Sequence, residues 1–114
     1  MLPVDSHAHL YDAMYAGQTE NVISSALGRV GFIICPSEDR KTSEQSVQIA
    51  SGESRVFAAV GIHPLHTEHV SEEDWKQILS LAKHSPKVVA LGETGLDFFS
   101  KDCDRELQKY WFSR

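Results

Sequence analysis

The sequence predicts an α/β fold in which four strands, each followed by a helix, form one parallel sheet. Two observations support this prediction. Short apolar runs alternate along the chain with stretches whose apolar residues recur at helical spacing, which is the order of βα units. The runs are also apolar throughout, as in strands that a parallel sheet buries on both faces.

Length and composition fit a single globular domain. The chain has 114 residues, of which 41% are hydrophobic, and this excludes a disordered protein. A net charge of −5 argues against binding nucleic acid through a broad basic surface, but not against an enzyme whose metal ions supply positive charge. The chain has no apolar run of membrane-spanning length, no signal-peptide pattern and no disulfide-framework spacing. We expect a cytoplasmic location, with the nucleus as the alternative.

The first two units are expected in the amino-terminal part of the chain. A strand is predicted at residues 2–7, and after a long loop a helix at 19–28 has its apolar side chains on one face. The second strand is the apolar run at 31–35, and its helix is predicted at 40–50. Each of these strands would bring the chain to the same edge of the sheet.

The third and fourth strands are predicted at 56–60 and 87–91. The helix between them should begin after Ser71, because Ser71-x-x-Asp74 resembles a capping box and acidic residues there oppose the positive end of the helix dipole. A last helix is predicted to begin near residues 102–104.

Residues that bind metals or move protons follow three of the four predicted strands. His7 and His9 end the first strand, and their spacing of two places both imidazoles on one side of an extended segment. His63 follows the third strand, while Glu93 and then Asp97 follow the fourth. Because parallel α/β folds collect functional groups at the carboxyl ends of their strands, this pattern predicts a metal site at that edge.

Glu93, His63 and Asp97 each also have an interpretation that involves no metal ion or substrate. A desolvated Glu93 needs a partner, which would be either a metal ion or an ion pair across the rim. His63 precedes a proline that holds it extended, so it would contact a phosphate or leaving group, or else be a loop histidine without a role. Asp97 would either orient a metal ligand through a hydrogen bond or cap the next turn.

The other histidines and the cysteines have no such context. His66, His69 and His84 are expected to be surface residues. Cys35 is predicted to be a small core residue, and Cys103 lies between acidic residues that disfavour a reactive thiolate.

Three segments together resemble the amino-terminal signatures of the TatD-like metal-dependent hydrolases. They are Asp5-Ser6-His7-Ala8-His9-Leu10, Gly61-Ile62-His63-Pro64 and Gly92-Glu93-Thr94-Gly95-Leu96-Asp97. The resemblance implies a TIM (β/α)8 barrel, of which this chain would form about half, and a phosphodiester hydrolase of the deoxyribonuclease type. It also implies two divalent ions per complete site, magnesium, zinc or manganese, and DNA or another phosphodiester as the substrate.

The resemblance also implies a role for each matching residue. His7 and His9 correspond to ligands of one metal ion, and Glu93 to the carboxylate that bridges both ions. His63 corresponds to a catalytic residue that contacts the substrate phosphate.

A complete barrel needs about 200 residues or more. The family's further histidine and aspartate ligands follow strands that these 114 residues do not include. Residues 1–114 are therefore expected to be a single incomplete domain of four βα units, a truncated fragment without activity of its own. The alternatives are a non-catalytic α/β module that self-associates or binds a partner and, with less motif support, another His-x-His hydrolase acting on C–N bonds.

Overall fold

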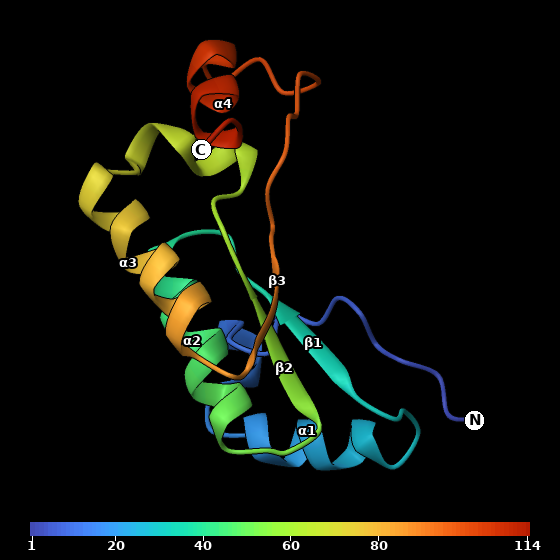
Figure 1. Cartoon of the computed structure of the whole chain (residues 1–114). Helices are drawn as coiled ribbons and strands as arrows, with labels where there is room; N and C mark the ends of the chain where they lie inside the picture. Colours follow the sequence, from blue (N-terminus) through green and yellow to red (C-terminus); the bar gives the residue numbers. More distant parts are fainter.

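The computed structural model describes residues 1–114 and contains one parallel sheet of three strands in the order β1-β2-β3. The strands are β1 (Ile33–Pro36), β2 (Val56–Val60) and β3 (Val88–Leu91). Helix α2 (Arg40–Ser51) joins β1 to β2, helix α3 (Glu72–His84) joins β2 to β3, and both lie on one side of the sheet (Figure 1). The predicted succession of βα units is confirmed for these three strands.

Four further helical segments complete the chain. They are the 3-10 helices η1 (Ala13–Tyr15) and η2 (Pro64–His69) and the α-helices α1 (Thr19–Leu27) and α4 (Arg105–Phe112). The α-helices lie within a few residues of their predicted positions, whereas neither 3-10 helix was predicted. None of the helices is long and apolar enough to cross a membrane.

The predicted strand at residues 2–7 is wrong in extent. Only Asp5 forms a bridge, which runs parallel to Ile33. The Asp5 amide donates to the carbonyl of Phe32 (3.1 Å), and the Asp5 carbonyl accepts from the amide of Ile34 (2.8 Å). The segment therefore lies beside β1, where the first predicted strand was expected, but no strand pairs with its other side and its pairing with β1 stays short.

The core lies between the sheet and its helices. Side chains from β1, β2, α1, α2 and the amino-terminal segment form one buried cluster: Leu10, Ile23, Leu27, Ile33, Cys35, Ala50, Val56 and Ala58. A smaller cluster near α3 and α4 contains Val60, Ile62, Ile78 and Trp111. The prediction that Cys35 is a core residue is confirmed, since its side chain is fully buried.

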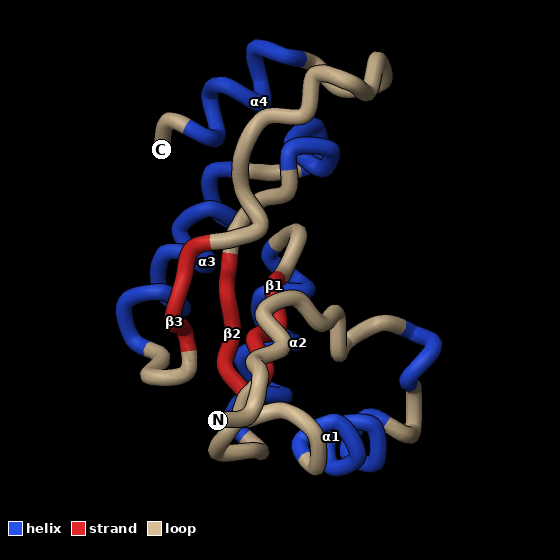
Figure 2. The backbone as a smooth tube through the Cα atoms, turned by 90° about the vertical axis from the view of Figure 1, so that its right-hand side faces the viewer, coloured by secondary structure: helices blue, strands red, loops and turns tan.

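The opposite side of the sheet carries no helix, and Figure 2 views the sheet from that side, with α2 and α3 behind it. Val89 and Leu91 of β3 are 51% and 60% exposed. One face of β3 is therefore open to solvent, as expected for a sheet that forms about half of a barrel. A continuous apolar run favours burial on two faces, but nothing in residues 1–114 covers this one.

The start of α3 combines a capping box with a contact to α2. The Ser71 hydroxyl accepts from the Asp74 amide (3.1 Å), and the Asp74 carboxylate accepts from the Ser71 amide (3.0 Å), which is the predicted capping box. The same carboxylate accepts from Arg40 Nε of α2 (2.7 Å). Hydrogen bonds from the Ser71 hydroxyl and amide, and then from Arg40, hold the pKa of Asp74 below its usual value.

We expect Asp74→Asn to lower stability at neutral pH, with a loss that disappears in acid. The carboxylate contributes its full stabilisation above its unfolded pKa of about 3.9, and that contribution is lost as the pH falls through the lower pKa of the folded state. The midpoint of urea unfolding at about pH 7 and below about pH 3 measures this difference. The control is Glu73→Gln in the same helical turn, which should have little effect at either pH. Equal midpoints for wild type and Asp74→Asn at neutral pH would contradict the argument.

Candidate metal centre

The segment that carries the two histidines is fixed by its contacts with β1 and the core. The Ala8 amide donates to the carbonyl of Ile34 (3.1 Å), and the His7 amide donates to the Asp5 carboxylate (3.1 Å). Leu10, just after the histidines, is only 3% exposed and packs into the larger core cluster. The backbone on both sides of the histidines is therefore anchored, and their rings project from the end of the short parallel pairing.

Glu93 is brought to the same edge by the ends of the neighbouring strands. The Gly92 amide donates to the carbonyl of Val60 (2.9 Å), and the Glu93 amide donates to the carbonyl of Ser37 (2.6 Å). The peptide bond between Gly92 and Glu93 is cis. Ser37 is fully buried, and its hydroxyl donates to the carbonyl of Ala59 (2.5 Å). The Glu93 backbone is thus held by residues that follow β1 and end β2.

A glycine at position 61 makes this arrangement sterically accessible. A Cβ atom at Gly61 would lie 2.6 Å from the carbonyl oxygen of Glu93 and 2.9 Å from the carbonyl carbon of Gly92. Both are backbone atoms and cannot rotate away. Any side chain at position 61 would therefore push the Glu93 backbone away from β2.

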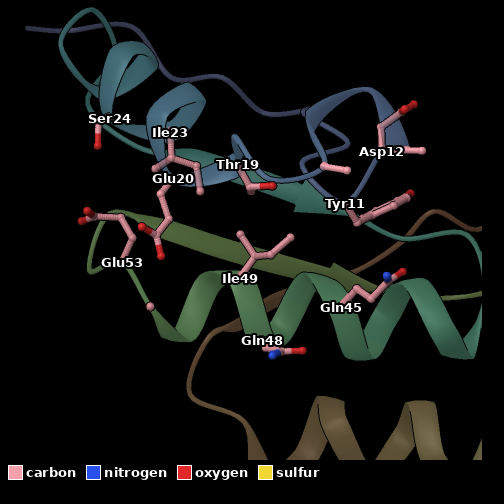
Figure 3. A pocket seen from close by; sticks show the side chains of 13 residues that line it. Tyr11, Asp12, Thr19, Glu20, Ile23, Ser24, Gln45, Gln48, Ile49 and Glu53 are labelled. Atoms are coloured by element: carbon pink, nitrogen blue, oxygen red, sulfur yellow. The ribbon is translucent and has the colours of Figure 1, made fainter.

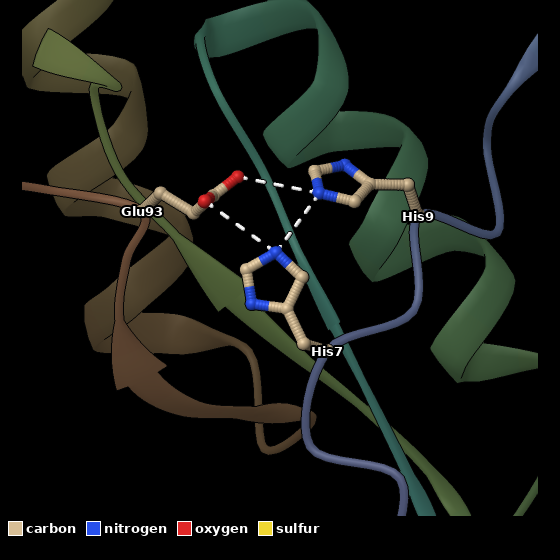
Figure 4. A group of neighbouring side chains, drawn as sticks. All are labelled: His7, His9 and Glu93. Carbon is tan, nitrogen blue, oxygen red and sulfur yellow. Dashed lines mark hydrogen bonds and ion pairs between the residues drawn. The ribbon is translucent and has the colours of Figure 1, made fainter.

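The three predicted metal ligands converge at this edge (Figure 4). His7 Nε2 lies 3.4 Å from Glu93 Oε1, His9 Nε2 lies 3.4 Å from Glu93 Oε2, and the two Nε2 atoms are 3.0 Å apart. All three ligand atoms lie within 4.8 Å of one another. Their side chains are between 24% and 54% exposed, so the cluster opens to solvent.

The chemistry of these donors fits a divalent cation. Two imidazole nitrogens and a carboxylate are a common ligand set for zinc, manganese and related ions. Three protein donors also leave further coordination positions open, which is typical of a catalytic rather than a structural metal site.

Tyr11 contacts this cluster and was missed by the sequence analysis. Its hydroxyl group is hydrogen-bonded to His9 Nδ1, and the two rings meet edge to face with centroids 5.3 Å apart. Burial, followed by the negative charge of Glu38, raises the pKa of Tyr11, so its phenol is neutral at physiological pH. The only available sequence signal was a hydroxyl-bearing aromatic residue two positions after a predicted ligand.

His63 follows β2 at the same edge but is not one of the three clustered residues. Its amide donates to the carbonyl of Glu38 (2.8 Å), and its Nδ1 accepts from the amide of Leu65 (3.1 Å), which makes it the N-cap of η2. Its ring lies beside that of His66, with centroids 5.5 Å apart. His66 is half-buried and so is less exposed than predicted, whereas His69 is exposed as expected.

Asp97 caps a turn in this structure. Its carboxylate accepts from the amides of Phe99 (3.0 Å) and Ser100 (3.4 Å), and its backbone is hydrogen-bonded to the buried side chain of Gln108. No hydrogen bond joins it to His7, His9 or Glu93. Its predicted role in supporting the metal ligands stays a prediction.

The largest hollow of the molecule lies beside the metal cluster and does not include it. A groove of about 770 Å³ runs between η1, α1 and α2 (Figure 3). Its lining is mostly polar, with glutamine, glutamate and threonine side chains. Tyr11 lies at one end of this groove and also contacts His9, so it connects the groove to the cluster.

Comparison with known proteins identifies relatives of this chain. It is 35% identical to the uncharacterized metal-dependent hydrolase YabD of Bacillus subtilis over 95% of its own length and 42% of the relative's. It is also 35% identical to the 3'-5' ssDNA/RNA exonuclease TatD of Enterobacter lignolyticus, with 96% of this chain and 42% of the relative covered. The chain thus spans about two fifths of the length of these relatives.

Solved structures confirm the fold class. The crystal structure of YjjV, a TatD homologue from Escherichia coli, superposes with a TM-score of 0.86 and 30% identity, covering 97% of this chain and 44% of that one. An uncharacterized amidohydrolase from Saccharomyces cerevisiae shares the fold with a TM-score of 0.83 at 16% identity, covering 98% of this chain and 42% of that one. The chain has the parallel βα architecture of part of a TIM-barrel-like fold. The family model described as TatD related DNase matches residues 4–114, and the chain belongs to that family.

Proposed function

We propose that the site at this sheet edge belongs to a metal-dependent phosphodiester hydrolase of the deoxyribonuclease type, acting on DNA or a related nucleic acid. The observation that supports this most strongly is the convergence of His7 and His9, from the amino-terminal segment, and Glu93, from the end of β3, onto one point. Two relatives' names agree with it, since one is called a metal-dependent hydrolase and another an ssDNA/RNA exonuclease.

His7, His9 and Glu93 would hold the metal. Each Glu93 oxygen faces a different histidine, and in the proposed site of two divalent ions this carboxylate is the group that contacts both. Magnesium, zinc and manganese are the candidates, and the imidazole donors favour zinc. The bound ions would act as Lewis acids toward a phosphodiester and would activate water for its hydrolysis.

His63 would contact the substrate phosphate. Its Nδ1 accepts a hydrogen bond from the Leu65 amide, so this nitrogen carries a lone pair and the ring proton of the neutral side chain is on Nε2. The free end of the ring is therefore a hydrogen-bond donor, which suits a phosphate oxygen or a leaving group. Asp97 is proposed to support the site from its turn without contacting substrate.

These 114 residues supply an incomplete ligand set for two ions. His7, His9 and Glu93 are the only group of three or more candidate ligands that the structure brings together. Two catalytic sites need more donors than three residues provide. We therefore propose that residues 1–114 form a single incomplete domain, inactive alone, and that further ligands come from outside it.

The proposed roles of Glu93 and His63 are separable by experiment. In the full natural protein, Glu93→Ala should abolish both bound metal and cleavage of single-stranded DNA, because the carboxylate shared by the ions is removed. His63→Ala should retain metal while turnover falls by about 10²–10⁴-fold, the range for a group that assists proton transfer. Metal analysis after dialysis and a nuclease assay with added manganese measure the two effects.

The matched control for these variants is His84→Ala, because His84 is an exposed histidine bonded only within α3. It should change neither metal content nor activity. Equal metal content in wild type and Glu93→Ala would refute the role of Glu93, and loss of metal from His63→Ala would refute the separation of roles.

We expect Gly61→Ala to weaken metal binding although position 61 supplies no ligand. The added methyl group would meet backbone atoms of Gly92 and Glu93 and displace the carboxylate from the two histidines. Calorimetric titration with manganese measures the affinity. The control is Gly52→Ala at the end of α2, where the new Cβ would make only an ordinary contact of 3.5 Å. Unchanged affinity in Gly61→Ala would show that the close approach does not position Glu93.

A second candidate function is that of a non-catalytic module that self-associates, and the uncovered sheet face supports it. Val89 and Leu91 are both more than half exposed on β3. Covering apolar area of this kind stabilises an assembly by roughly 25 cal/mol per Å². On this proposal the isolated chain forms a dimer of defined mass.

Light scattering coupled to size exclusion tests the second candidate. The isolated chain should elute as a dimer, and the double variant Val89→Glu, Leu91→Glu should elute as a monomer. Phe99→Glu is the control, since Phe99 is 96% exposed and lies outside the sheet. A wild-type monomer, or an aggregate without defined mass, would count against the module and in favour of an incomplete domain.

A further inference from the structure

We infer that Tyr11 is a positioning residue of the metal centre, whose hydroxyl oxygen accepts the Nδ1 proton of His9 so that His9 Nε2 presents a lone pair to the ion. The inference rests on the proposed metal-binding function of His7, His9 and Glu93. It assigns a role to a residue that lies outside the three ligands and outside the motifs that predicted them.

The contact is specific to one of the two histidines. His9 has both ring nitrogens engaged, Nδ1 by Tyr11 and Nε2 within the cluster. His7 has only Nε2 engaged, and its Nδ1 has no hydrogen-bond partner. A ring bonded at both ends is fixed in rotation, whereas a ring bonded at one end is not. The site therefore has one ligand that is preorganised for metal and one that is free to adjust.

Tyr11 is itself held in place. Its ring packs against the larger core cluster. The turn that carries it is closed by a hydrogen bond from the Asp12 amide to the carbonyl of His9 (3.0 Å). The donor and the acceptor of the His9–Tyr11 bond thus belong to one short turn on the core, and the bond is maintained without an ion.

The two contacts of His9 are satisfied by either tautomer, and a metal ion at Nε2 would select the one with the proton on Nδ1, because the ion needs the Nε2 lone pair. His7 Nε2 and His9 Nε2 lie 3.0 Å apart, so one of them donates and the other accepts. With its proton on Nδ1, His9 accepts from the Nε2 proton of His7 and donates to Tyr11. Metal binding then requires a change of tautomer at His7 alone.

The tautomer of each histidine is measurable without metal. In ¹⁵N-resolved NMR spectra of the metal-free protein at about pH 8, above the usual imidazole pKa of about 6.5, His9 should carry its proton on Nδ1. Tyr11→Phe keeps the ring and removes the hydroxyl, so the His9 proton should redistribute toward Nε2. The matched control is Tyr15→Phe, which removes a hydroxyl group that has no hydrogen-bond partner in η1 and should leave the His9 signals unchanged.

Metal affinity provides the second readout. Calorimetric titration with zinc should give a dissociation constant about 10–100-fold weaker for Tyr11→Phe than for wild type or Tyr15→Phe, the usual cost of removing a ligand's hydrogen-bond partner. Wild-type affinity together with a wild-type tautomer in Tyr11→Phe would overturn the inference. A proton on His9 Nε2 in the wild-type protein would overturn it as well, whether or not the variant folds. Failure of the wild-type protein to bind zinc would instead refute the metal centre, and the tautomer would still report on Tyr11.

Discussion

The candidate site depends on main-chain hydrogen bonding at the carboxyl ends of parallel strands. Adjacent parallel strands end at the same edge of the sheet, and each strand continues from there into a loop. In this protein the loops remain bonded to each other, as in the hydrogen bond from the Glu93 amide to the carbonyl of Ser37 and that from the His63 amide to the carbonyl of Glu38. His7 and Glu93, almost 90 positions apart in sequence, therefore meet because their backbones are held in place. No contact between their own side chains is needed.

This constraint explains why side chains are sparse where the backbones cross. The Glu93 backbone passes so close to β2 that only a hydrogen atom fits at position 61. Ser37, whose carbonyl accepts from the Glu93 amide, is completely buried, and its hydroxyl donates a hydrogen bond to the backbone of β2. The contacts that hold the Glu93 backbone are therefore mainly with other main-chain atoms, which are less mobile than side chains and keep the carboxylate directed at the histidines.

The sequence predicted the parts of this structure that follow from local periodicity and strand order. His7, His9 and Glu93 were found because ligand residues directly follow apolar runs, and parallel topology then places them together. The hydrogen bond between Tyr11 and His9 was missed because it depends on the orientation of two rings, which no spacing encodes. The strand at residues 2–7 was predicted too long. Its apolar residues indicate an extended backbone, but they do not show whether another strand pairs with the side away from β1. The exposure of Val89 and Leu91 on β3 agrees with the expectation of about half a barrel, because the inner face of a barrel is covered only when the remaining strands close it.

Electrostatics gives the proposed metal ions a role beyond catalysis. The net charge of −5 on these 114 residues repels a polyanionic substrate at a distance. Two divalent ions at the edge would concentrate positive potential where the phosphodiester has to lie. On the proposed function, the residues that hold the ions therefore also determine whether nucleic acid binds, and loss of metal should weaken substrate binding as well as turnover.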